Sequence, residues 1–262
     1  MSEKKRLIEN KRGQVTIFII IAILVIAVVV LIYLLFPKIK STVETQTQSP
    51  NEYIQTCISE KISDTLKTIS LNGGTLNTNG GNSYFYLGNN VQYLCYTNQY
   101  YSTCVVQEPL LIQHIESEIE SGISDNVNSC FASMVASYRN NGYDAELKYS
   151  TTEMLIQLLP ERLVVTFDNE LTLTKGETQT FNDFSVVSNT NIYEVASIAQ
   201  SIVDWEQGLG DAPVSTYMDW YPNLKIEKVL ETDGTKIYII TDRETDEVFQ
   251  FASRSGVLPV GY

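Results

Sequence analysis

Residues 51–71, NEYIQTCISEKISDTLKTISL, carry the repeat that decides the fold. Apolar side chains recur there at spacings of three and four, and polar or charged residues fill the positions between them. The apolar set is Ile54, Cys57, Ile58, Ile62, Leu66 and Ile69. This is the period of an amphipathic helix with one buried face. The turn sequence Asn72-Gly73-Gly74 predicts the end of the helix.

A second helical pattern begins near Glu108 and ends at Asn140-Asn141-Gly142. Its apolar stripe contains Ile112, Ile115, Ile119, Ile123, Val127, Cys130, Phe131, Met134, Val135 and Tyr138. Gly122 predicts a break or bend in this helix, because glycine weakens a helix interior. We expect the two stripes to pack against each other.

All four cysteines, Cys57, Cys95, Cys104 and Cys130, lie between residues 51 and 140. An even number of cysteines outside the cytosol favours disulfides, and four cysteines allow three connectivities. We favour Cys57 with Cys130, because both lie on the facing stripes, and Cys95 with Cys104, which closes a local loop. A zinc site is the alternative, weakened by the lack of any Cys-x-x-Cys pair and by a single histidine.

The remaining chain alternates as strands do, apart from one more helix. Strand-like runs at 145–150, 154–158, 163–173 and 178–187 predict a small antiparallel sheet. A helix over 192–207 follows, and then a three-stranded meander over 224–254. The predicted fold class is therefore α+β: an N-terminal transmembrane helix followed by a disulfide-stapled extracytoplasmic domain of helices and antiparallel sheet. We divide that part into an α+β region, 51–190, and a helix with its meander, 191–262.

Residues 14–36, QVTIFIIIAILVIAVVVLIYLLF, contain no charged side chain. As a helix they would span about 33 Å, enough to cross a lipid bilayer through its ~30 Å hydrocarbon core. The leader, residues 1–13, is rich in lysine and arginine, which predicts a cytoplasmic amino terminus and an extracytoplasmic carboxy-terminal part. The sequence thus predicts a single-pass cell-membrane protein, with a polar stalk over 37–50.

The charge of the chain excludes one class of partner. Removing the five basic and two acidic residues of the leader from the totals of 18 and 31 leaves 13 and 29, a net charge of −16. Nucleic acid binding needs a basic face for the phosphate backbone. No nucleic acid partner is therefore expected.

The junction Lys11-Arg12-Gly13-Gln14-Val15-Thr16 resembles the class III signal peptide of archaeal type IV pilin-like proteins. The resemblance implies cleavage between Gly13 and Gln14 by a prepilin peptidase, and other pilin-like subunits as partners. Phe18 departs from the family, because many type IV pilins have Glu at that mature position. An uncleaved signal anchor is the alternative. The later layout also resembles uncharacterised membrane-anchored proteins of small-genome archaea, which implies no activity.

Residues suited to catalysis or metal binding are sparse. His114 lacks a cysteine or serine motif around it, and no Gly-x-Ser-x-Gly elbow occurs. Four acidic residues near a predicted hairpin suit a solvated turn better than a calcium loop, since the EF-hand spacing and glycine are missing; they are Asp242, Glu244, Asp246 and Glu247. We predict no enzyme activity and no cofactor.

Tyrosine is abundant around the second cysteine pair. Tyr96, Tyr100 and Tyr101 are the candidates for a surface that contacts a ligand, and packing beneath the loop is the alternative. The function predicted from these patterns is that of a pilin-like subunit, of a minor kind, in surface filament assembly or adhesion. The alternative is a surface receptor or ligand-binding domain that does not polymerise.

Overall fold

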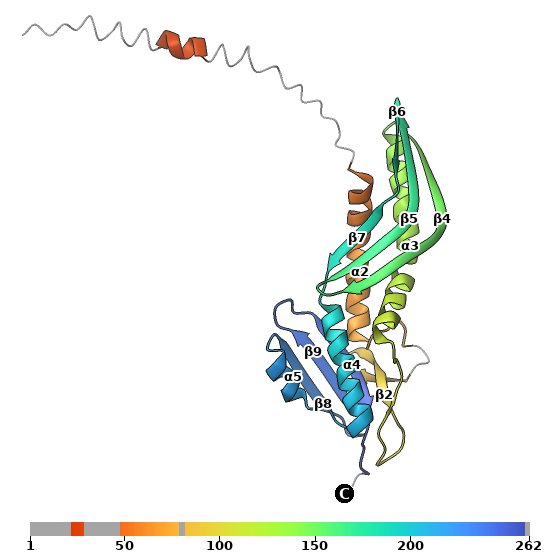
Figure 1. Ribbon diagram of the computed structural model, residues 1–262, viewed down its shortest axis with the longest axis vertical. Coiled ribbons are helices and arrows are strands. Elements are labelled where there is room, and N and C mark those ends of the chain that lie inside the picture. Colours follow the sequence, from red (N-terminus) through yellow and green to blue (C-terminus); the bar gives the residue numbers. More distant parts are fainter. Residues whose placement is uncertain (1–21, 29–47, 79–81, 260–262) are drawn as a thin grey trace, which may run out of the picture. The chain divides into compact units, whose positions relative to one another are not determined.

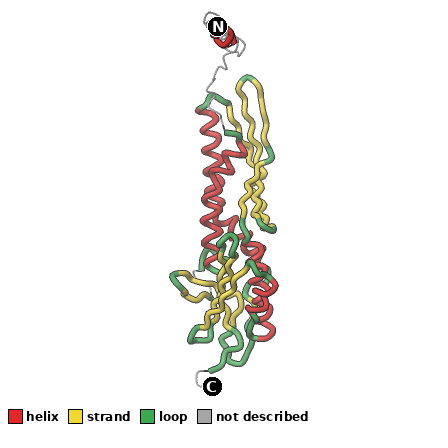
Figure 2. The backbone as a smooth tube through the Cα atoms, turned by 90° about the vertical axis from the view of Figure 1, so that its left-hand side faces the viewer, coloured by secondary structure: helices red, strands yellow, loops and turns green. Residues whose placement is uncertain are grey.

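The computed structural model describes residues 22–28, 48–78 and 82–259. The chain divides into two compact units, Met1–Thr47 and Gln48–Tyr262. Within the second unit, an upper part packs two long helices against one sheet, and a lower part packs two shorter helices against another (Figures 1 and 2).

The prediction of a transmembrane helix over 14–36 needs correction. Residues 22–28 are helical. No helix in the described ranges is long and apolar enough to cross a membrane. This finding contradicts the predicted fold class in its transmembrane part and the single-pass location. The leader 1–13, the rest of 14–36 and residues 37–47 of the predicted stalk lie outside the described residues.

Helix α2, Pro50–Leu71, begins within the predicted stalk. The side chain of Ser49 accepts a hydrogen bond from the backbone N–H of Glu52 at 3.3 Å, and Pro50 follows it at the first helical position. Both are helix-start signals, because the cap satisfies a free N–H and proline has none to lose. The apolar stripe expected from the sequence is buried, except that Cys57 is exposed.

Helix α3, Leu111–Asn140, runs without a break. Gly122 does not interrupt it: a Cβ at this position would come within 2.8 Å of the side chains of Thr65 and Leu76. The glycine therefore permits the close approach of α2 and the loop that follows it. Nearer the start of α2 in the same helix pair, a disulfide joins Cys57 to Cys130, with the two Cα atoms 6.0 Å apart.

The upper sheet has four antiparallel strands and covers the helix pair (Figure 2). They are β4 (Asp144–Leu159), β5 (Arg162–Lys175), β6 (Glu177–Phe181) and β7 (Phe184–Asn189). β5 is central, because β4 pairs along one side of it while β6 and β7 share the other. The edge of β7 is closed by α2, since the side-chain amide of Gln55 both donates to and accepts from Val187 at 3.0 Å. Such closure protects an edge strand from pairing with another chain.

The lower sheet contains the predicted meander, β8 (Leu224–Leu230), β9 (Lys236–Asp242) and β10 (Val248–Arg254). β10 also pairs in parallel with β2 (Asn89–Tyr96), which the sequence assigned to the region 51–190. β1 (Ser83–Tyr86) and β3 (Val105–Val106) flank β2. The second disulfide, Cys95–Cys104, joins β2 to the loop before β3. Both disulfides are the pairs favoured from the sequence.

Two helices lie over one face of the lower sheet (Figure 1). α4 (Ile192–Leu209) packs on β2, β9 and β10, and α5 (Val214–Trp220) packs on β8. The sheet residues beneath them are buried and apolar: Leu224, Ile226, Tyr238, Ile240, Phe249 and Phe251. One continuous core therefore runs from the upper part of the unit to these helices.

Candidate functional site

Both tryptophans of the chain, Trp205 and Trp220, are exposed to solvent. Their exposed fractions are 40% and 68%. Trp205 lies on α4, one turn before the exposed Leu209, and Trp220 ends α5. Tryptophan is on average a highly buried residue. Because two tryptophans on consecutive helices are exposed, this surface is a candidate contact site.

The sequence places Trp205 outward because α4 buries its opposite face. Val195, Ala199, Ile202 and Val203 point into the core at helical spacing. The helix ends at Gly210, which adopts a left-handed conformation with φ of 79°. This is the usual residue for that conformation at a helix end. Trp205 thus lies on a helix whose opposite face packs into the core and whose end is set by Gly210.

Tyr217 of α5 is buried and connects α5 to α4. Its hydroxyl lies 2.6 Å from that of Ser201 on α4, and its ring lies 6.3 Å from the ring of Trp220 in an edge-on arrangement. We call the exposed set Trp205, Leu209, Trp220 and Tyr221 the aromatic face.

The surroundings of Tyr217 affect its ionisation. Burial raises the pKa of the Tyr217 hydroxyl, and the charge of Asp204 adds to the rise. The hydrogen bond with Ser201 acts in the opposite direction, but the net pKa remains above its ordinary value. The hydroxyl therefore stays protonated at neutral pH, and it is a positioning group for the rings rather than an acid or a base.

The aromatic face is acidic. Residues 192–223 contain five acidic residues and no lysine, arginine or histidine. Each tryptophan directly follows an aspartate, Asp204 and Asp219, and both are exposed. Within residues 48–78 and 82–259, neither of these aspartates makes an ion pair. Their charges are therefore free to act on a partner.

The basic side chains that reach this stretch from outside are already engaged. Lys228 binds Asp211 at 2.8 Å, and Lys236 binds Glu206 at 2.8 and 2.9 Å. Arg243 donates to the backbone oxygen of Pro222 at 2.9 Å. These contacts neutralise Asp211 and Glu206, and none of the described lysines or arginines forms an ion pair with Asp204 or Asp219.

A buried polar network anchors the end of α4 beneath this face. The Glu206 carboxylate is fully buried and accepts hydrogen bonds from Lys236, Tyr238 and Ser253. Burial raises the pKa of the Tyr238 hydroxyl, and the adjacent Glu206 charge raises it further. Every partner in the network is satisfied by another, which is how a buried charge is tolerated. The network therefore stabilises the end of α4 against the lower sheet.

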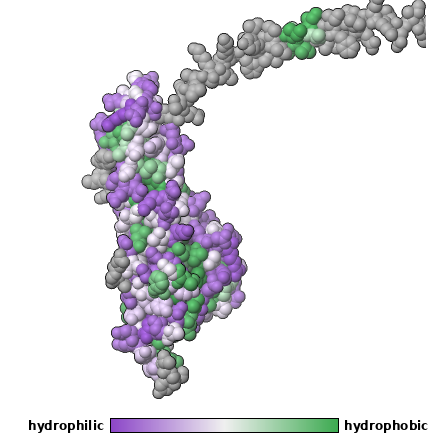
Figure 3. Space-filling view, turned by 180° about the vertical axis from the view of Figure 1, so that it is seen from behind, coloured by the Kyte–Doolittle hydropathy of each residue, from purple (hydrophilic) through white to green (hydrophobic). Residues whose placement is uncertain are grey.

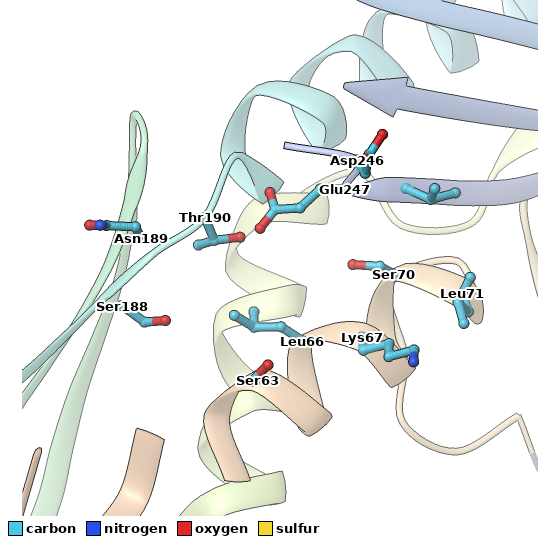
Figure 4. Close-up of a pocket in the computed structure, with 11 residues that line it drawn as sticks. Ser63, Leu66, Lys67, Ser70, Leu71, Ser188, Asn189, Thr190, Asp246 and Glu247 are labelled. Carbon is cyan, nitrogen blue, oxygen red and sulfur yellow. The ribbon is translucent and has the colours of Figure 1, made fainter. Parts of the chain in front are cut away.

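A cavity of about 310 Å³ lies elsewhere, between α2, the β7–α4 connection and the β9–β10 turn (Figure 4). Lys67 and Glu247 both line it, but the Lys67 amine points away from the Glu247 carboxylate. Glu247 instead accepts from the backbone N–H of Asn191, at the start of α4. These polar groups stabilise the junction, and they lack the mutual approach that acid–base chemistry requires.

The tyrosines predicted as a contact surface are only partly exposed. Tyr100 and Tyr101 are exposed, whereas Tyr96 is half-buried and packs edge-on against Tyr93 with ring centres 4.9 Å apart. The Arg254 guanidinium lies over the Tyr100 ring, 5.6 Å from its centre. The structure therefore separates Tyr96 from the other two.

The other predicted sites are placed as follows. His114 lies 3.7 Å from Glu108 at a surface position. Asp242 is buried and accepts from the backbone N–H groups of Glu244 and Thr245, so it caps the turn. In the part of the chain that the structure describes, no group of three or more histidine, cysteine or acidic residues could hold a metal ion. The predicted cleavage site, Gly13-Gln14, lies outside the described residues.

The lower sheet offers a second apolar surface. On the back of the molecule, an apolar stripe crosses its lower half (Figure 3). A small cluster on the sheet face turned away from α4 has a buried centre, Val91, Tyr93, Ile237 and Ala252, with half-buried residues around it. Val229 and Ile239 are examples. This cluster is less exposed than the aromatic face and lacks tryptophan.

Sequence reasoning missed the aromatic face. The signal was present as two Asp-Trp pairs, Asp204-Trp205 and Asp219-Trp220. Helical spacing also places Trp205 off the apolar stripe of α4. The short helix α5 lacks a strong period, so Trp220 had no predicted position.

Comparisons of this chain with protein-family models, curated proteins and solved structures find no match.

Proposed function

We propose that this chain is a non-catalytic interaction protein, a pilin-like subunit in assembly or adhesion, that contacts its partner through the aromatic face. The observation that carries the proposal is the exposure of both tryptophans above a buried, hydrogen-bonded tyrosine. Tryptophan and tyrosine are enriched among the residues that dominate binding energy at protein interfaces. The pilin-like part of the proposal rests on the resemblance around Gly13 and Gln14.

Rigidity supports the same proposal. α4 is packed along its length, and the buried network at Glu206 fixes its end. A contact surface on fixed elements loses little side-chain and backbone entropy when a partner binds. The aromatic face is therefore better prepared for binding than the loop that carries Tyr100 and Tyr101.

A ligand-binding domain that does not polymerise is the second candidate. It is favoured by a cavity of about 420 Å³ at the end of α4, which Tyr100, Asp211 and Asp233 help to line. Sedimentation of the full chain separates the two candidates. Concentration-dependent association supports the assembling subunit, and a monomer at all concentrations supports the ligand-binding domain.

The proposal is tested by binding of the full chain to three immobilised probes: an arginine-rich peptide, a glutamate-rich peptide and dextran. We expect the wild type to bind at least one probe, and Trp205→Ala/Trp220→Ala to weaken that binding by roughly tenfold or more, because the anchoring rings are lost. Tyr100→Ala/Tyr101→Ala is the matched control, since it also removes two exposed aromatic side chains.

Two results contradict the proposed binding surface. One is binding that survives loss of both tryptophans. The other is binding that is lost in the tyrosine variant instead, which would move the contact surface to the Cys95–Cys104 loop. Circular dichroism of each variant verifies that the fold is retained.

A further inference from the structure

We propose that the partner of the aromatic face is a basic polypeptide segment, whose arginine or lysine side chains lie on the indole rings and pair with Asp204 and Asp219. The proposal rests on the proposed function, because it assigns a chemical class to the partner of that same surface. It follows from charge complementarity between the surface and its occupant.

The first support is the distribution of charge. The 32 residues from 192 to 223 contain five acidic residues and no basic one. Contacts within the molecule neutralise Glu206 and Asp211 through Lys236 and Lys228. The charge that remains at the aromatic face is therefore negative. An acidic partner would be repelled here, and a cationic partner would be attracted and oriented.

The second support is the chemistry of the exposed rings. The face of an indole ring carries negative electrostatic potential, and tryptophan is the best aromatic partner for a lysine or arginine cation. An arginine also covers a ring with its planar guanidinium while its N–H groups reach a carboxylate. Asp204 and Asp219 add an exposed carboxylate on each of the two helices that carry the rings.

The protein already uses this contact elsewhere. The Arg254 guanidinium lies 5.6 Å from the centre of the Tyr100 ring, and the Lys175 amine lies 4.7 Å from that of Tyr143. Both of these cations belong to the chain itself. Among the described residues, no lysine or arginine lies over the ring of Trp205 or Trp220.

The test uses the full chain and a dye-labelled, arginine-rich peptide without tryptophan, followed by fluorescence anisotropy. We expect saturable binding that weakens as salt is added, because exposed charge pairs are screened. Asp204→Asn/Asp219→Asn should weaken binding roughly tenfold. The same peptide with glutamine in place of arginine should not bind.

Asp64→Asn/Asp125→Asn is the matched control, since it removes two exposed carboxylates of α2 and α3 and leaves the same net charge. We expect it to retain nearly wild-type affinity. Equal weakening by both double variants would overturn the proposal, because the peptide would then be attracted by overall charge alone. Equal binding of the glutamine peptide would overturn it as well.

Failure of this inference can be told apart from failure of the proposed function. If dextran binds in a manner that needs Trp205 and Trp220 but is insensitive to salt and to the asparagine changes, the aromatic face is a contact surface and its partner is a neutral glycan. If no probe depends on the tryptophans, the proposed function fails together with this inference.

Discussion

At the scale of single residues, the buried pair of Glu206 and Lys236 shows how one contact can hold a helix end. Lys236 bridges the Glu206 carboxylate and the backbone oxygen of Gly210, where α4 stops. Gly210 also packs closely against Gly256, since a Cβ added at Gly210 would lie 3.3 Å from the Gly256 Cα. The pair therefore ties α4 to the last strands of the lower sheet.

Lys236→Met should destabilise the fold by about 3–5 kcal/mol, because it leaves the Glu206 carboxylate buried without its cation. The measurement is the free energy of unfolding in urea. Lys228→Met is the matched control, since the carboxylate that Lys228 binds, Asp211, is 61% exposed, and a surface pair contributes about 0–1 kcal/mol. Similar losses in the two variants would show that the buried pair has no special role.

The stability of the fold should also depend on alkaline pH through Tyr93. Burial raises the pKa of the Tyr93 hydroxyl to about 12, from an ordinary value of 10.0. Because the folded pKa is the higher one, the stabilisation is complete below pH 10 and is lost as the pH rises toward 12. Tyr93→Phe should therefore show a smaller fall in urea midpoint across this range than the wild type. An equal fall would contradict the assignment.

The residue scale is also where sequence reasoning was weakest. Tyr217 of α5 packs against Trp220 and bonds Ser201 of α4, one helical turn before Trp205. A short helix such as α5 has too few turns to reveal a period. The predicted contact residues Tyr100 and Tyr101 are exposed, but no feature of the sequence set Tyr96 apart from them.

At the scale of elements, the two long helices were predictable because their apolar residues repeat at spacings of three and four. The same stripes placed Cys57 opposite Cys130, and the structure joins them. The antiparallel meander was also predictable, since alternation and short turns define it. The parallel pairing of β2 with β10 was not, because strand alternation alone does not identify a partner so distant in sequence.

The disulfide between α2 and α3 should contribute more to the free energy of unfolding than the other disulfide. It closes a loop of 73 residues, compared with 9 for Cys95–Cys104. Cys57→Ala/Cys130→Ala should lower the free energy of unfolding by about 4 kcal/mol on the chain-entropy model. We expect a smaller loss for Cys95→Ala/Cys104→Ala. Urea unfolding of both variants checks the order, and the reverse order would contradict it.

At the scale of the whole molecule, the polar groups that stabilise the fold are distinct from those that are open to a partner. The buried network at Glu206 and the junction at Glu247 are satisfied within the fold. By contrast, Asp204 and Asp219 of the aromatic face form no ion pair among the described residues. The described unit therefore combines a rigid, disulfide-linked body with one acidic, tryptophan-bearing surface, and this combination is what we expect of an interaction protein.

The most direct test of the central claim is acrylamide quenching of tryptophan fluorescence in the full chain, with and without the arginine-rich peptide. The chain has two tryptophans and both lie on the aromatic face, so the emission reports on that surface alone. We expect ready quenching of the free protein and clear protection at saturating peptide. Quenching that stays unchanged while anisotropy shows the peptide bound would contradict it, because the peptide would then occupy another surface.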